Sequence, residues 1–141
     1  QAYCAAPGCA FCDGPGYHYR QHADSASRRG LPPQSLDDQR RAAALIRGSV
    51  PGQWPVLQQS ANAYYYEKLV YLASMILRRA DIEPDRVQLG ELRIGITAGL
   101  NDRQLGRNPQ LPFAIKVSAW ATVHAPKLWR KVCRKYLKDR Q

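Results

Sequence analysis

The order of apolar and polar residues predicts two helices in the first half of the domain. Ser35 is placed to cap a helix that continues to Arg47, and Asp38 follows it as in a variant capping box. Gly48 is a suitable stop for this helix. From about Gln58 to Ala80, apolar residues cover almost the whole helical circumference. We therefore expect this second helix to be central and buried.

The period of the pattern changes in the second half of the chain. Val87 to Leu100 and Phe113 to His124 both alternate between apolar residues and polar or small ones, which is typical of half-buried strands. The polar segment Asn101–Pro112 between them is long for a hairpin turn but suits a contact loop. The pattern therefore predicts an α+β fold, with a small antiparallel strand pair packed on helices.

The C-terminal segment Lys127–Gln141 is predicted to form an amphipathic helix, and Pro126 suits its first turn. With seven basic residues and one acidic residue, this segment carries +6 of the chain's net charge of +10. The predicted apolar face consists of Leu128, Trp129, Val132, Cys133, Tyr136 and Leu137. The predicted cationic face consists of Lys127, Arg130, Lys131, Arg134, Lys135 and Lys138. Such a helix can dock on its own protein and still present cations to an anionic partner.

Composition limits the class of protein. A chain of 141 residues with 45% hydrophobic residues has room for one folded domain with a modest core. The most apolar run, Leu69–Leu77, is too short to span a membrane.

A pI near 9.8 favours a polyanionic partner: nucleic acid in the first place, and an anionic membrane or an acidic protein in the second. Further candidate RNA contacts are Arg103 and Arg107 in the long loop, and Arg28 and Arg29 near the N-terminus.

Residues 1–34 are predicted to form an extended arm, separate from a single domain over residues 35–141. The arm is rich in Gly, Pro and polar residues and has no periodic apolar positions, so it needs a metal, disulfides or a partner to become ordered. Its Cys residues follow the pattern C-x4-C-x2-C, and two His residues come after them. These thiols and a fourth donor suit tetrahedral zinc. The candidate ligands are Cys4, Cys9, Cys12, His18, His22 and Cys133.

Two other states of these cysteines remain open. The spacing from Ala2 to Cys12 is similar to the cluster-binding loop of plant-type [2Fe–2S] ferredoxins, which implies a [2Fe–2S] cluster. Those proteins have strands before the loop, whereas only three residues precede Cys4 here, so we favour zinc and do not assign the chain to that family. Four cysteines also suit two disulfides in an oxidising compartment.

The sequence contains no motif for nucleophilic catalysis, zinc-dependent proteolysis or phosphate binding by a Gly-rich loop. We therefore expect a non-enzymatic protein: a basic, RNA-binding structural subunit of a ribonucleoprotein particle, of the organellar ribosome type, with other protein subunits as neighbours. The start at Gln1 instead of Met, together with the basic charge, favours a mitochondrial or other organellar location.

Two alternative functions remain open. One is an accessory subunit of a large membrane-associated complex of the respiratory type, with the basic helix on lipid head groups. The other is a small exported protein with two disulfides.

Overall fold

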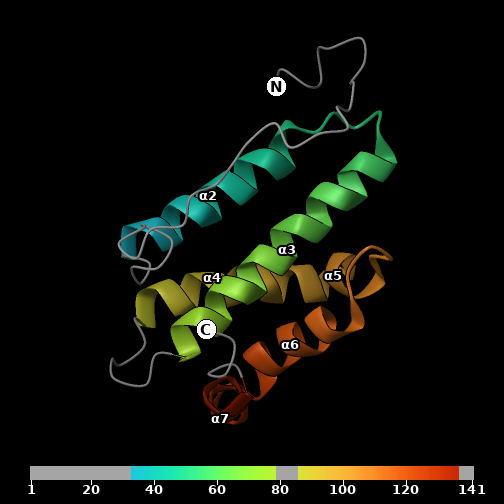
Figure 1. Ribbon diagram of the computed structural model, residues 1–141. Helices are drawn as coiled ribbons and strands as arrows, with labels where there is room; N and C mark the ends of the chain where they lie inside the picture. Colours follow the sequence, from blue (N-terminus) through green and yellow to red (C-terminus); the bar gives the residue numbers. More distant parts are fainter. Residues whose placement is uncertain (1–32, 79–85, 137–141) are drawn as a thin grey trace, which may run out of the picture.

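The computed structural model describes residues 33–78 and 86–136, and the described residues form helices joined by short connections, with no strand (Figure 1). The helices are α2 (Pro33–Ser49), α3 (Pro55–Arg78), α4 (Arg86–Asn101), α5 (Gln104–Arg107), α6 (Phe113–His124) and α7 (Pro126–Tyr136). The predicted α+β fold is therefore wrong, and the described part of the chain is all-helical. The predicted N-terminal arm, residues 1–34, lies almost entirely outside the described residues.

Helix α3 is the centre of the fold, as the sequence predicts. It packs against α2, α4, α5, α6 and α7 and supplies most residues of the buried core cluster. Leu72 and Ala73 are completely buried, and Tyr66 and Leu69 are nearly so. The helix begins at Pro55, a little earlier than predicted. Because α3 contacts five other helices, most of its circumference is apolar, and the face that stays exposed is narrow.

Helix α2 is also present as predicted, but its ends differ from the sequence interpretation. It begins at Pro33, so Ser35 lies inside the first turn and is not the capping residue. Proline is well suited to this first position because its missing N–H would have no partner there. The helix ends at Ser49, one residue beyond the predicted stop at Gly48. Figure 1 shows α2 and α3 running side by side in opposite directions.

The strand predicted over Val87–Leu100 is a helix, α4. Leu92 and Ile96 are 3% and 0% exposed, whereas Ile94 between them is 71% exposed. Residues four apart share a face of a helix, while residues two apart do not. Leu89 and Leu100 extend the same buried face. Leu92 and Ile96 are therefore buried as two residues on one face of a helix. The alternation of Leu92, Ile94 and Ile96 does not reflect a strand.

The strand predicted over Phe113–His124 is a helix as well, α6. Ala119 and Thr122 are buried, and Ile115 and Val123 pack against the core beside them. This spacing follows one face of a helix. Val117 is 44% exposed although a strand would have placed it on the same face as Ile115 and Ala119. The segment is apolar on both sides, so alternation alone did not distinguish the two structures.

The loop predicted over residues 101–112 contains the short helix α5 and is tied to the rest of the fold. The side-chain oxygen of Gln104 accepts hydrogen bonds from the Tyr66 hydroxyl at 3.2 Å and from the Arg47 guanidinium at 3.0 Å. Asn108, which is buried, donates a hydrogen bond to the main-chain oxygen of Gln59 at 2.9 Å. These contacts fix the position from which α6 begins.

Helix α4 approaches α3 closely at two glycines. A Cβ atom on Gly95 would lie 2.9 Å from Leu69 Cδ1. A Cβ atom on Gly99 would lie 2.6 Å from Cζ of Tyr66 and even closer to Cε1 of that ring. Side chains at these positions would push α4 away from the buried part of α3, so packing requires glycine there.

Candidate nucleic-acid interface

Helix α7 docks on α3 and α6 through the apolar face that the sequence predicts. Cys133 is 0% exposed and forms a hydrogen bond with the side chain of Ser74 on α3. Trp129 and Val132 are half-buried on the same side. Leu128 departs from the prediction, since it is 64% exposed. The helix is therefore held in place by a narrower apolar stripe than the sequence indicated.

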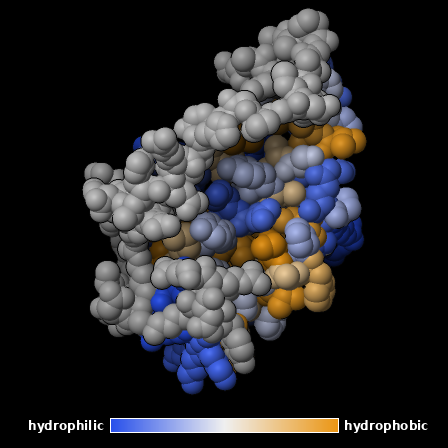
Figure 2. Space-filling model, viewed as in Figure 1, coloured by the Kyte–Doolittle hydropathy of each residue, from blue (hydrophilic) through white to orange (hydrophobic). Residues whose placement is uncertain are grey.

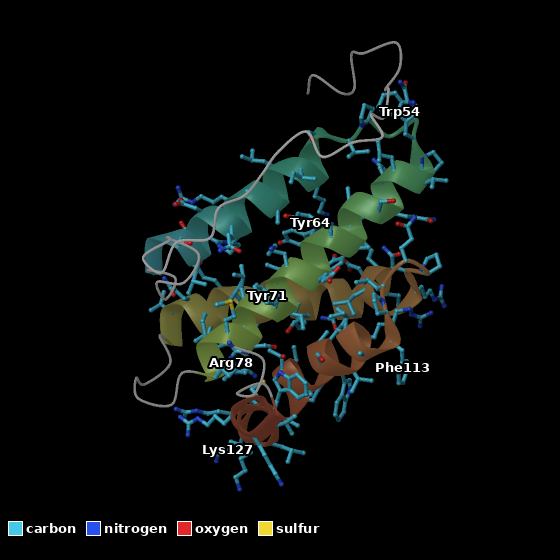
Figure 3. All side chains as sticks on the ribbon, viewed as in Figure 1. Trp54, Tyr64, Tyr71, Arg78, Phe113 and Lys127 are labelled. Carbon is cyan, nitrogen blue, oxygen red and sulfur yellow. The ribbon has the colours of Figure 1, made fainter. Side chains whose placement is uncertain are left out.

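The cations of α7 divide into two groups. Lys127, Lys131 and Lys135 are exposed and spaced four residues apart, so they form one row, which we call the lysine row. Arg130 and Arg134 are half-buried beside it. Lys127 projects outward at the lower end of the molecule in Figure 3, and Figure 2 shows hydrophilic side chains gathered there. The predicted cationic face is therefore present as one exposed row with two shielded arginines.

Acidic residues are absent from a long stretch around this helix. Between Arg103 and Tyr136 the chain has eight Lys and Arg residues and no Asp or Glu. Arg103 and Arg107 are both exposed, and they lie at the α5 end of α6, whereas the lysine row lies beyond its other end (Figure 1). The stretch itself therefore contributes positive charge only.

Helix α6 carries an exposed row of apolar and aromatic side chains. Phe113 is 80% exposed, Val117 44% and Trp120 56%, and their spacing of four and three residues places them on one face. The exposed His124 continues this face, and its ring lies 5.2 Å from that of Trp120 at an angle of 36°. We call these four residues the α6 stripe. The sequence interpretation missed the stripe because it took the segment for a strand; counting at helical spacing would have found it.

A second exposed aromatic row lies along α3 (Figure 3). Tyr64 and Tyr71 are 42% and 50% exposed, and the ammonium group of Lys68 lies over both rings, at 5.8 Å and 5.3 Å from their centroids. Each ring therefore already has a cation partner from its own helix. This row stabilises the surface of α3 without any ligand.

An ion-pair network joins α2 to α4. Arg40 pairs with Asp37 at 2.7 Å and with Glu91 at 3.1 Å. The hydrogen bond from Arg40 lowers the pKa of Asp37 below its usual value, so this carboxylate stays ionised. Arg41 also pairs with Asp37, at 2.8 Å. Asp37 thus holds two guanidinium groups on α2, and Arg40 makes the link to α4 through Glu91. An acid kept ionised in this way is poorly suited to proton transfer.

The predicted arm and tail sites fall outside the described residues. These are the candidate metal ligands Cys4, Cys9, Cys12, His18 and His22, and the candidate RNA contacts Arg28, Arg29 and Lys138. Of the candidate metal ligands, the structure describes Cys133, which is buried on the side of α7 that packs against α3. Within residues 33–78 and 86–136, no three His, Cys, Asp or Glu side chains gather as a metal site would require. Zinc binding by the arm stays a prediction.

Burial of Cys133 predicts a pH effect on stability. Desolvation raises the pKa of this thiol above its ordinary value of 9.0. Above about pH 9 the unfolded chain therefore releases the proton more readily than the folded chain, and the free energy of unfolding falls, by at most about 1.4 kcal/mol per pH unit. Below that pH the thiol contributes no pH dependence.

The Cys133→Ala variant is expected to lose this part of the alkaline destabilisation. The measurement is urea unfolding with reductant at pH 8 and pH 10 for both proteins. Tyr66, whose pKa is also raised by burial, contributes equally to the two proteins and cancels in the comparison. Identical pH dependence in both would show that the thiol is solvated in the folded state.

Comparisons with known protein families, with curated proteins and with solved structures found no match to this chain. None of the helices within residues 33–78 and 86–136 is both long and apolar enough to cross a lipid bilayer. Function is therefore inferred from the charges, rings and contacts of the described helices.

Proposed function

We propose that this protein is a non-catalytic RNA-binding subunit of a ribonucleoprotein particle and that α7 is its main contact with RNA. The observation that carries the proposal is the lysine row, which is exposed on a helix with no acidic residue. Three ammonium groups along one line of a helix suit a run of phosphates, because lysine binds phosphate as a point charge.

The way α7 is held supports a structural role. The helix is anchored on α3 by Cys133 and on α6 by direct packing, so its cations are positioned before any ligand binds. A helix that is already ordered loses little backbone conformational entropy on binding. Contacts of this kind fix a subunit on the RNA backbone without reading its sequence. A particle of the organellar ribosome type, with zinc in the N-terminal arm, is the setting we propose.

The proposal is tested by the salt dependence of RNA binding by the full chain. With three to five phosphate contacts from α7, the logarithm of the affinity for a short oligoadenylate should fall with log salt with a slope of about −2 to −3.5. Affinity that does not change with salt would rule out α7 as a phosphate-binding element. For the alternative of a membrane-associated subunit, the protein should instead float with phosphatidylserine vesicles after nuclease treatment.

A further inference from the structure

The α6 stripe has a composition that phosphate binding by α7 does not explain. Phe113 and Trp120 are the two most exposed aromatic side chains of the described residues, and both rings lie on one face of one helix. The opposite face of α6 packs on the core through Ala119 and Thr122. The helix is thus fixed by one side while it presents aromatic rings on the other.

Positive charge lies at both ends of the stripe. Arg103 and Arg107, at α5, precede its first residue in the chain, and the lysine row begins three residues after its last, His124. A helix of 12 residues is about 18 Å long, so the two basic groups are separated by roughly that distance. Phe113 and Lys127 both project from the lower side of the molecule in Figure 3. An elongated anion that contacts both basic groups would therefore run along α6, the helix that carries the rings.

We infer that the α6 stripe is a stacking platform for unpaired RNA bases, so that α5, α6 and α7 together bind single-stranded RNA in preference to duplex. This inference rests on the proposed function. A groove of positive charge with aromatic rings along it is the usual design of proteins that bind single strands, because any base can stack on a ring. In a duplex the bases are already stacked and paired, and the rings would have no partner.

The stripe suits bases better than lipid. His124 lies against Trp120 within the stripe, and the lysine row follows directly. Burying an imidazole in hydrocarbon without a hydrogen-bond partner is costly. An imidazole beside a nucleic acid can instead stack on a base or donate to a phosphate. The rings and the imidazole therefore suit the bases of a single strand, and the lysines that follow suit its phosphates.

The test replaces both rings by leucine, in the double variant Phe113→Leu, Trp120→Leu. Leucine keeps the surface apolar but removes stacking. We expect the affinity for a short oligoadenylate to fall about 30-fold or more, with an unchanged salt slope, and the affinity for an RNA duplex of the same length to stay the same. Tyr71→Leu, at an exposed ring on α3, is the matched control and should bind oligoadenylate like the wild type.

The outcomes separate this inference from the proposed function. If the leucine variant binds oligoadenylate as tightly as the wild type, the stacking platform is refuted, whereas a steep salt slope still supports phosphate binding by α7. If the wild type binds neither single strand nor duplex, both proposals fail. If wild type and leucine variant float equally well with phosphatidylserine vesicles, and oligoadenylate does not compete, the stripe is a membrane contact. Circular dichroism and thermal unfolding check that the variants are folded.

Discussion

Replacement of Lys127, Lys131 and Lys135 together by glutamine is expected to weaken binding to single-stranded RNA about 100-fold at 0.1 M salt. Each phosphate contact adds about 0.7 to the salt slope for a single strand, so the loss of three contacts should reduce the slope by about 2. The three side chains are exposed, and glutamine is nearly as good a helix former as lysine. Fluorescence anisotropy with labelled oligoadenylate over a salt series measures both quantities.

A control variant separates the lysine row from net charge. Arg41→Gln, Lys68→Gln removes two cations from α2 and α3 and leaves α7 itself unchanged. If the row binds phosphate, this variant should keep the wild-type salt slope. An equal loss of slope per charge in both variants would mean that RNA responds to overall charge and not to α7. Arg130 and Arg134 are left unchanged because they are half-buried and their removal would disturb packing.

The Gly99→Ala variant is expected to lower the free energy of unfolding by about 1–3 kcal/mol, although alanine is the better helix former. The added methyl group would overlap the ring of Tyr66, which is 2% exposed and therefore cannot swing aside. The ring is further held by the hydrogen bond from its hydroxyl to Gln104. Relief of the overlap requires α4 to shift from α3. Urea unfolding of the full chain measures the change.

Gly90 in the same helix provides the matched substitution. No atom lies within 4 Å of a Cβ placed there, so Gly90→Ala should raise the free energy of unfolding by about 0.5–1 kcal/mol through helix propensity alone. The two variants thus make the same chemical change in one helix with opposite expected signs. Stabilisation by both would show that α4 does not approach Tyr66 as closely as the structure has it.

The helices with a strong local signal were predictable from the sequence. Gln58–Ala80 is too long and too apolar for anything but a central helix, and α3 covers most of that range. In Lys127–Gln141, charged and apolar residues fall on opposite faces when they are placed at helical spacing. Helix α7 confirms this prediction as far as Tyr136. The lysine row was predictable for the same reason, since charged residues on an amphipathic helix tend to face solvent.

The second half of the fold was not predictable from alternation. In α4 the positions Leu92, Ile94 and Ile96 fit a strand and a helix equally well over so short a window, and burial of the first and third is decided by contact with α3. The error had a consequence for the site. A strand would have put Phe113 and Val117 on one side and Trp120 on the other, which hides the aromatic row of α6.

The sequence alone determined that positive charge is concentrated near the C-terminus on a helix, because charge and helical periodicity are properties of neighbouring residues. The tertiary structure decided which members of that helix reach solvent. Leu128 is exposed and Arg130 is half-buried, contrary to their polarity, because α3 and α6 cover one particular side of α7. It also decided that the α6 stripe lies next to cations, since α6 runs from the arginines at α5 to the lysine row on α7. Burial depends on residues distant in the chain, and periodicity records only local order.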